Sequence, residues 1–275
     1  MLHNSLFVFD IETIPDIEAV HNLTGSETKD VNKLREELEK YHIDLSGNPF
    51  PRQPFHKIVA ISFLETEISI NNDGTEEYSL TEIRSGGNEN SSEEEIVKGF
   101  FHYLSKKKPR FVSYNGRTFD LPVLKYRAIK YGISAPWFYR SGDKWNNYTQ
   151  RYSLDWHCDL LEAFSDFGAS ARCKMNEVCS ILGIPGKFGV DGSKVTELYD
   201  TKKIKEIRDY CETDVINTYL LYLFYQMHTG AISQESFVNS AEQIANYLET
   251  EGKNKDKKHF IEFLEEWKKV DDRFF

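Results

Sequence analysis

The sequence has no long hydrophobic run, few cysteines and no excess of positive charge, and each of these absences excludes a class of protein. No apolar stretch reaches the roughly 18 residues of a membrane-spanning helix, so we expect no membrane segment. Residues 1–5 have neither a basic segment nor a cleavage pattern, and an apolar strand follows directly. We therefore expect no signal peptide and a cytoplasmic location.

The four cysteines are too widely spaced to form a C-x-x-C pair: Cys158, Cys173, Cys179 and Cys211. Structural zinc sites are usually built on such closely spaced thiols, so we do not expect a zinc ribbon. Cysteines of a cytosolic chain stay reduced. We expect these side chains to be buried or functionally neutral.

Lysine and arginine number 34 against 44 aspartate and glutamate residues, which gives a net charge of −10. Proteins that coat duplex DNA neutralise many phosphates with basic side chains, so this balance argues against such a role. It is compatible with an enzyme that holds a short single-stranded end. Part of the acidity can belong to a carboxylate cluster that divalent cations neutralise.

The hydrophobic pattern predicts an α/β fold in which a mixed sheet is flanked by helices. Leu6 to Ile11 is apolar on both alternating faces, which is typical of a central strand covered on both sides. Further strands are predicted at 57–64, after the turn at 72–74, at 110–114 and at 152–158, and residues 134–150 are predicted to form a loop. Helices are predicted at 30–42, 93–107, 119–131, 159–165, 174–182, 193–200 and 203–227, then at 233–250 and 259–269.

The length of 275 residues fits one large domain with an appendage. We predict a main domain over residues 1–229, interrupted by an insertion at about 22–48. Gly230 ends the longest predicted helix. Residues 230–275 are then predicted to form a helical C-terminal extension.

Acidic residues occur at three places where the predicted elements allow them to meet. Asp10 and Glu12 are two apart on a strand, so their side chains project from the same face and repel each other unless a cation binds. Asp120 lies in the first turn of a helix, after the turn at Asn115-Gly116. Each signal is weak alone, because strands often end in polar residues and acids are favoured in first helical turns.

Tyr210 and Asp214 are four residues apart in the longest predicted helix, and so share one face. Ile207 is on the same face, which should therefore point inward, where a buried carboxylate needs a partner or a metal. Asp209 and Glu212 fall on other faces and are predicted to be solvated. Together, the four acids on the inward faces are the oxygen ligands that hard cations such as Mg²⁺ prefer.

Three motifs around these residues resemble one family of nucleases. They are Phe9-Asp10-Ile11-Glu12-Thr13, then Tyr114-Asn115-Gly116-Arg117-Thr118-Phe119-Asp120-Leu121-Pro122-Val123-Leu124, then Tyr210-Cys211-Glu212-Thr213-Asp214. Their order resembles the DEDDy branch of the DnaQ-like 3′→5′ exonucleases, and most of all the stand-alone family related to the exonuclease domain of family B DNA polymerases. The stretches 183–187 and 191–193 are similar to this family as well. The resemblance covers roughly residues 5–227 and implies a ribonuclease H-like fold.

The resemblance also implies a role for each acid and for the tyrosine. Asp10 would bridge two Mg²⁺ or Mn²⁺ ions, and Glu12 and Asp214 would hold the ion nearer the attacking water. Asp120 would support the second ion, and Tyr210 would orient the water. The implied reaction is release of nucleoside monophosphates from a single-stranded 3′ end, with DNA favoured over RNA.

Substrate contacts are predicted at Thr13, Asn115, Phe119 and Lys187, with Phe119 stacking on the terminal base and Lys187 contacting a phosphate. One acid or histidine of the cluster at 155–159 is a candidate to support a metal ligand. Two other functions stay open: a nucleic-acid-binding module without catalysis, and a ribonuclease H-like endonuclease. All four acids are present, and the Tyr210–Asp214 spacing favours the exonuclease. The sequence gives no indication of protein partners.

Overall fold

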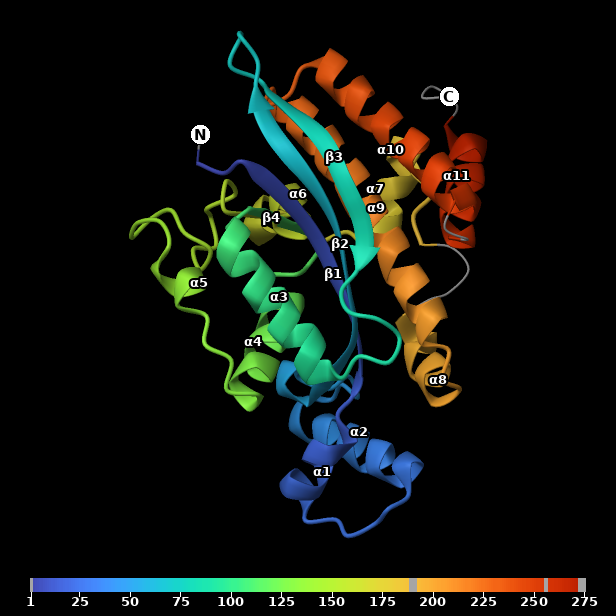
Figure 1. The fold of residues 1–275 in the computed structure, drawn as a ribbon. Helices are drawn as coiled ribbons and strands as arrows, with labels where there is room; N and C mark the ends of the chain where they lie inside the picture. Colours follow the sequence, from blue (N-terminus) through green and yellow to red (C-terminus); the bar gives the residue numbers. More distant parts are fainter. Residues whose placement is uncertain (1, 188–191, 255–256, 272–275) are drawn as a thin grey trace.

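The computed structural model of the chain describes residues 2–187, 192–254 and 257–271. A five-stranded mixed sheet with the order β3-β2-β1-β4-β5 forms its centre (Figure 1). β1 pairs antiparallel with β2 and parallel with β4, so the predicted mixed sheet is confirmed. The strands are β1 (Ser5–Pro15), β2 (His56–Ile70), β3 (Glu76–Ser85), β4 (Arg110–Ser113) and β5 (His157–Asp159).

Helices cover both faces of this sheet (Figure 1), and the predicted helices are confirmed with ends that differ by a few residues. They are α1 (Ile17–Thr24), α2 (Val31–Ser46), α3 (Glu93–Lys107), α4 (Asp120–Lys130), α5 (Pro136–Arg140), α6 (Leu160–Phe164), α7 (Met175–Leu182), α8 (Val195–Asp200), α9 (Ile204–Thr229), α10 (Gln234–Asn254) and α11 (Lys258–Val270). Within the described parts of the chain, no helix is both long and apolar enough to cross a membrane.

The alternation of side chains along β1 divides the core into two layers. Leu6 and Val8 pack with residues of α9, α10 and α11. Phe7, Phe9 and Ile11 pack with α3 and α4 on the other face. Because the period of a strand is two residues, the next side chains on the α9 face are acidic and are those of the predicted site.

Two predictions between β4 and α6 differ from the structure. The predicted loop at 134–150 contains the short helix α5. The predicted strand at 152–158 is reduced to β5, because only three residues of the short strand β4, from Phe111 to Ser113, pair with it. Asp191, part of the stretch that resembles the family, lies outside the described residues.

The segment between β1 and β2 contains two helices. The predicted helix at 30–42 is α2, and α1, which the sequence pattern did not predict, precedes it. Val20 from α1 packs with Leu34 and Leu38 from α2 in a small core of their own. Figure 1 shows this helical pair beyond one end of the sheet.

The C-terminal helices are attached to α9 through Glu212, which was wrongly predicted to be solvated. Its side chain is buried, and one carboxylate oxygen accepts a hydrogen bond from Ser85 Oγ at 2.9 Å. The other oxygen lies 3.0 Å from Lys257 Nζ and 2.9 Å from His259 Nε2. The C-terminal segment therefore supplies the cationic and polar groups that allow a charged side chain of α9 to be buried.

This contact predicts a loss of stability in Glu212→Gln. The exchange keeps the size of the side chain but leaves a buried ion pair without its acid, and we expect the free energy of unfolding to fall by about 1–3 kcal/mol. Chemical denaturation measures this, with Glu242→Gln on the exposed face of α10 as the control. An equal effect in both variants would contradict the role of Glu212.

The pH dependence of this effect follows from the pKa of Glu212. Burial would raise that pKa, but the hydrogen bond to His259 and the charge of Lys257 outweigh burial, and the pKa is lowered. A carboxyl whose pKa is lower in the folded state stabilises the protein above its unfolded pKa. The difference between wild type and Glu212→Gln should therefore persist near neutral pH and shrink as the pH falls through the lowered pKa.

Candidate active site

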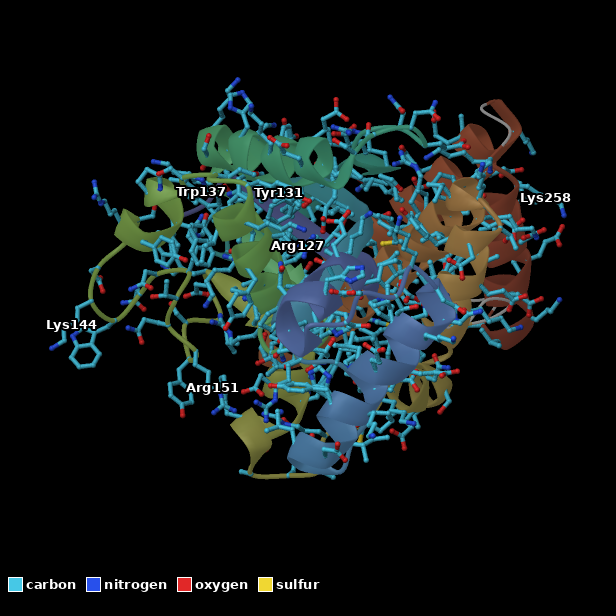
Figure 2. All side chains as sticks on the ribbon, turned by 90° about the horizontal axis from the view of Figure 1, so that it is seen from below. Arg127, Tyr131, Trp137, Lys144, Arg151 and Lys258 are labelled. Carbon is cyan, nitrogen blue, oxygen red and sulfur yellow. The ribbon has the colours of Figure 1, made fainter. Side chains whose placement is uncertain are left out.

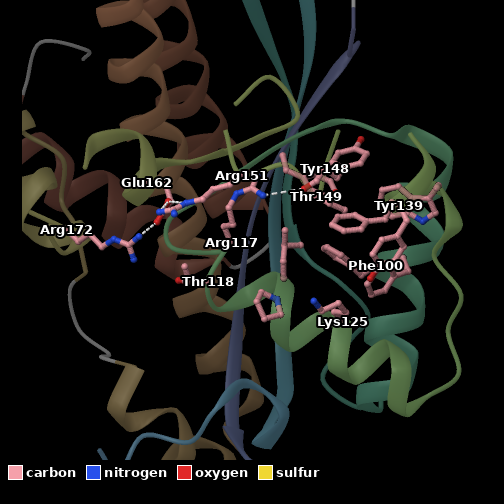
Figure 3. Close-up of a pocket in the computed structure, with 16 residues that line it drawn as sticks. Phe100, Arg117, Thr118, Lys125, Tyr139, Tyr148, Thr149, Arg151, Glu162 and Arg172 are labelled. Atoms are coloured by element: carbon pink, nitrogen blue, oxygen red, sulfur yellow. Dashed lines mark hydrogen bonds and ion pairs between the residues drawn. The ribbon is translucent and has the colours of Figure 1, made fainter. Parts of the chain in front are cut away.

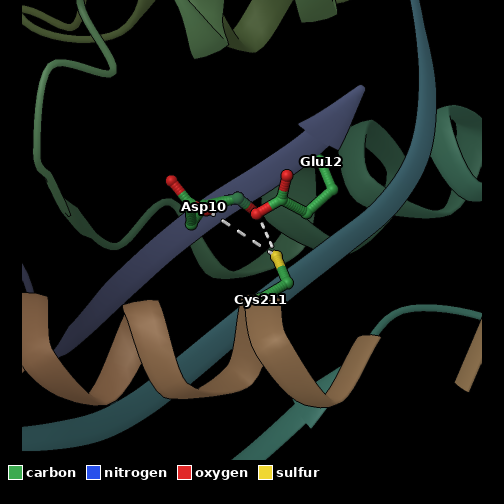
Figure 4. Close-up of side chains that lie close together, drawn as sticks. All are labelled: Asp10, Glu12 and Cys211. Atoms are coloured by element: carbon green, nitrogen blue, oxygen red, sulfur yellow. Dashed lines mark hydrogen bonds between the residues drawn. The ribbon is translucent and has the colours of Figure 1, made fainter. Parts of the chain in front are cut away.

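Asp10 and Glu12 project from the α9 face of β1 toward Cys211, as Figure 4 shows. One ligand atom from each of the three residues lies within 4.8 Å of the other two. Cys211 Sγ lies 3.4 Å from the main-chain oxygen of Asp10 and 3.8 Å from its Oδ2. Burial and the nearby carboxylates raise the pKa of the Cys211 thiol, so the sulfur acts as a hydrogen-bond donor. Nothing in the sequence indicates that the Cys211 side chain meets these acids.

Tyr210 and Asp214 lie one turn apart on the inward face of α9, as the spacing predicts. Lys187 contacts both: its Nζ donates to the Tyr210 hydroxyl at 2.9 Å and forms an ion pair with Asp214 Oδ2. The second carboxylate oxygen of Asp214, Oδ1, is buried and has no hydrogen-bond partner among the residues that the structure describes. This oxygen is a free acceptor inside an acidic site.

Asp120 is the first residue of α4 and is buried. Its Oδ1 accepts a hydrogen bond of 3.1 Å from the main-chain N–H of Ile11, the residue between Asp10 and Glu12. This bond fixes the start of α4 against β1. Asp120 lies outside the tightest group formed by Asp10, Glu12 and Cys211, but its charge acts on Glu12.

The turn that leads into Asp120 is held by Asp159 at the end of β5. Asp159 Oδ1 accepts from the main-chain N–H of Asn115 at 2.9 Å and of Leu161 at 3.1 Å, and Oδ2 accepts from that of Arg117 at 2.8 Å. Of the cluster predicted to support the site, Asp159 is therefore the residue that shapes this turn. His157 is hydrogen-bonded to Ser113 instead.

Gly116 is required in the same turn by close packing. A Cβ atom on Gly116 would lie 2.5 Å from Ser113 Oγ, closer than any side chain tolerates. Asn115, its neighbour, has a φ of 67°, in the left-handed region that asparagine tolerates better than most residues. The Asn-Gly pair thus lets the chain turn sharply between β4 and α4.

Burial raises the pKa values of all four acids, and repulsion by a neighbouring carboxylate adds to this at Asp10, Glu12 and Asp120. Burial and the charge of Asp214 raise the pKa of Asp10 to about 7. Burial is also the main cause for Glu12 and Asp120, with the charge of Asp10 next. Burial raises the pKa of Asp214 although Lys187 opposes it. Buried carboxyls of this kind are stabilised by a bound cation.

The residues present fit a divalent cation. The side chains offer carboxylate oxygens, which are the ligands of Mg²⁺ and Mn²⁺, and Asp214 Oδ1 has no other partner. Lys187 supplies the positive charge next to Asp214 in this structure. The ligand atoms of Asp10, Glu12 and Cys211 lie close enough together to share one ion.

A cleft of about 370 Å³ opens beside these acids and is lined in part by Asp10, Asn115 and Lys187. Two further candidates for substrate contact lie close to His56. Thr13 Oγ1 is 2.9 Å from His56 Nδ1, and the ring of Phe119 meets the His56 ring at 4.9 Å between centroids. The predicted substrate residues thus form two groups: Asn115 and Lys187 line the cleft, and Thr13 and Phe119 lie beside His56.

His56 and Phe50 are neighbours of the site that the sequence analysis missed. Phe50 is 58% exposed and lies 5.9 Å from Phe119 between ring centroids, so the pair forms a partly exposed aromatic surface. A lone histidine at the start of a strand carries no recognisable signal. Phe50, an aromatic residue in a proline-rich loop, was the feature of the sequence that could have pointed to a substrate contact here.

The five-stranded mixed sheet flanked by helices is consistent with a ribonuclease H-like fold. Residues 48–267 match the family of predicted 3′–5′ exonucleases related to the exonuclease domain of PolB, and the chain belongs to this family. The fold expected from the resemblance is confirmed. No curated protein matches the chain significantly.

The matched region contains Asp120, Tyr210 and Asp214 and begins after Asp10 and Glu12. It also includes all of α10 and most of α11. The predicted division of the chain at residues 229 and 230 stays a prediction. The buried contacts of Glu212 explain physically why the C-terminal helices accompany the rest of the fold.

Proposed function

We propose that the protein is a metal-dependent 3′→5′ exonuclease that hydrolyses single-stranded nucleic acid, DNA in preference to RNA, and releases nucleoside monophosphates. The observation that carries this proposal is the convergence of buried acids from β1, α4 and α9, one of which keeps an unpartnered oxygen. Membership of a family of predicted 3′–5′ exonucleases supports the direction of attack.

In this proposal, Asp10, Glu12, Asp120 and Asp214 hold two divalent cations, Mg²⁺ or Mn²⁺. Such a pair stabilises the attacking and leaving oxygens of an in-line phosphoryl displacement. The Tyr210 hydroxyl, beside Asp214 on the same helix face, orients the attacking water. The tyrosine stays protonated, because burial and the charge of Asp214 raise its pKa.

In the same proposal, Lys187 contacts Asp214 in the free protein and a substrate phosphate in the complex. Its ammonium now neutralises Asp214, and it is 37% exposed at the cleft. Bound cations would supply the positive charge that Lys187 gives Asp214 in this structure, and the ammonium would then be available to a substrate phosphate, as the sequence predicts. Phe119 stacks on the terminal base, which favours an unpaired 3′ end because a paired base must first be unstacked.

The proposal is tested with oligonucleotides labelled at the 5′ end. A free 3′ end should give a ladder of shortening products in Mg²⁺ or Mn²⁺, faster on a single strand than on a blunt duplex. A 3′ phosphate or a terminal phosphorothioate should block or slow the ladder. Equal digestion of capped and free strands would exclude attack from the 3′ end.

The two other candidate functions give different results in the same assay. Internal cuts would indicate an endonuclease, and protection without cleavage would indicate a binding module. EDTA should abolish the ladder, because the acids alone provide no positive charge at the scissile phosphate. Full activity in EDTA would contradict the assignment of the four acids as metal ligands. Matched DNA and RNA strands measure the preference between the two.

A further inference from the structure

A second cavity, of about 550 Å³, lies between α3, α4 and the segment that contains α5 (Figure 3). Its lining is mainly aromatic and includes Phe111, Trp137, Phe138 and Tyr148. The rings support one another: Phe138 is stacked on Tyr148, with 5.5 Å between centroids and 11° between planes. Tyr139 also lines the cavity and is 57% exposed. Phe111 and Tyr148 are fully buried, so the aromatic side chains that the cavity presents to solvent are Tyr139 and, in part, Trp137 and Phe138.

Charged side chains around this surface are mostly cationic. Glu162 is buried and forms ion pairs with Arg151 and Arg172, whose side chains remain 43% and 42% exposed. Arg117 and Lys125 complete the charged lining, and among the described residues no carboxylate lies within ion-pair distance of either. The lining thus has a net positive charge in a chain whose net charge is −10.

The aromatic cavity adjoins the active-site cleft. Arg172 lines both, and the cleft is the one that contains Asp10 and Lys187. Thr118, two residues before Asp120, also lines the cavity. A nucleic-acid strand bound at the acids would therefore pass the cavity, which lies next to the cleft.

We infer that the aromatic cavity binds a base of the strand being degraded, on the 5′ side of the scissile phosphate, while Lys125 and Arg172 contact the backbone. This inference rests on the proposed function. Aromatic side chains stack with any base, and neighbouring Lys and Arg side chains contact the phosphates along the backbone. Proteins that bind single strands without sequence preference combine these two kinds of contact. A nuclease acting at a 3′ end has only the terminal nucleotide beyond the scissile phosphate. Only the 5′ portion is long enough to reach a second cavity.

The test compares a long oligothymidylate with a thymidine dinucleotide, which is too short to span both sites. Lys125→Glu and Tyr139→Ala change exposed side chains, so melting temperatures should stay close to wild type. Tyr139→Ala should lower the ratio of kcat/KM on the long strand to that on the dinucleotide by roughly 5- to 150-fold, the range for one stacked base. Lys125→Glu, which reverses the charge at a backbone contact, should lower the same ratio. Lys258→Glu, on the far side of the molecule from Trp137 (Figure 2), should leave the ratio unchanged.

A series of oligothymidylates with one abasic position at increasing distance from the 3′ end locates the contact. One position should slow the wild-type enzyme, and Tyr139→Ala should remove that sensitivity. Wild-type ratios in both variants, with no sensitive position, would overturn the cavity assignment and leave the exonuclease intact.

Absence of 3′ release by the wild type would instead overturn the proposed function. The cavity is then judged by anisotropy of labelled oligothymidylate, measured in Mg²⁺ on Asp10→Asn. Weaker binding when Tyr139→Ala is added supports the cavity as a single-strand site. Equal binding overturns it.

Discussion

Asp10→Asn should reduce the rate of nucleotide release by about 1000-fold or more, because it weakens a cation site that supplies several kcal/mol of transition-state stabilisation. Ligand atoms of Asp10, Glu12 and Cys211 lie within 4.8 Å of one another, and the charge of Asp10 also acts on Asp120. The exchange keeps the shape of the side chain and removes one negative charge from a cluster of repelling acids. The folded protein should therefore be at least as stable as wild type in EDTA.

Single-turnover hydrolysis of a labelled single strand in saturating Mg²⁺ measures the effect of Asp10→Asn. Glu67→Gln, an exposed acid on the neighbouring strand β2, is the matched control and should retain the wild-type rate. Thermal unfolding in EDTA and in Mg²⁺ gives an independent result. Mg²⁺ should raise the melting temperature of wild type more than that of Asp10→Asn, because a ligand stabilises the fold to which it binds. Near-normal activity in the variant would remove Asp10 from the site.

Tyr210→Phe should lower the rate by about 10- to 1000-fold, the range of one positioned catalytic group. The exchange deletes only the hydroxyl, which lies 2.9 Å from Lys187 Nζ. The ring packs with Ile207 and Val195, and those contacts are kept. The melting temperature should therefore change little, and KM should change less than kcat.

The control for Tyr210→Phe is Tyr225→Phe, which removes a hydroxyl from the same helix away from the acids. Circular dichroism verifies that both variants keep the fold. If Tyr210→Phe and Tyr225→Phe both release nucleotides at the wild-type rate, Tyr210 is a packing residue of the core and has no part in orienting water.

Local periodicity was sufficient to predict the elements that carry the acids. The period of two residues in β1 places Asp10 and Glu12 on one face, and the spacing of four in α9 places Tyr210 beside Asp214. These relations hold for any strand or helix, whatever surrounds it. The length of β5 was not predictable in this way, because β4 offers it only three partners.

The burial of Glu212 shows the limit of the same reasoning. The charge of Glu212 indicates exposure to solvent, but Lys257 and His259, at the start of α11, cover its side chain. A single helix carries no information about which later segment will pack on each face. The aromatic cavity has the same origin, since α3, α4 and the α5 segment contribute to it from separate parts of the chain.

The sequence by itself determined the order of the motifs and indicated the mixed sheet, and short-range geometry alone set the shared faces of Asp10 with Glu12 and of Tyr210 with Asp214. Only the tertiary structure decided that Lys187 pairs with Asp214 and that Asp159 shapes the turn before Asp120. It also decided that Cys211 meets Asp10. These contacts join residues far apart in the chain, and they form only because packing of the sheet and its helices brings the distant segments together.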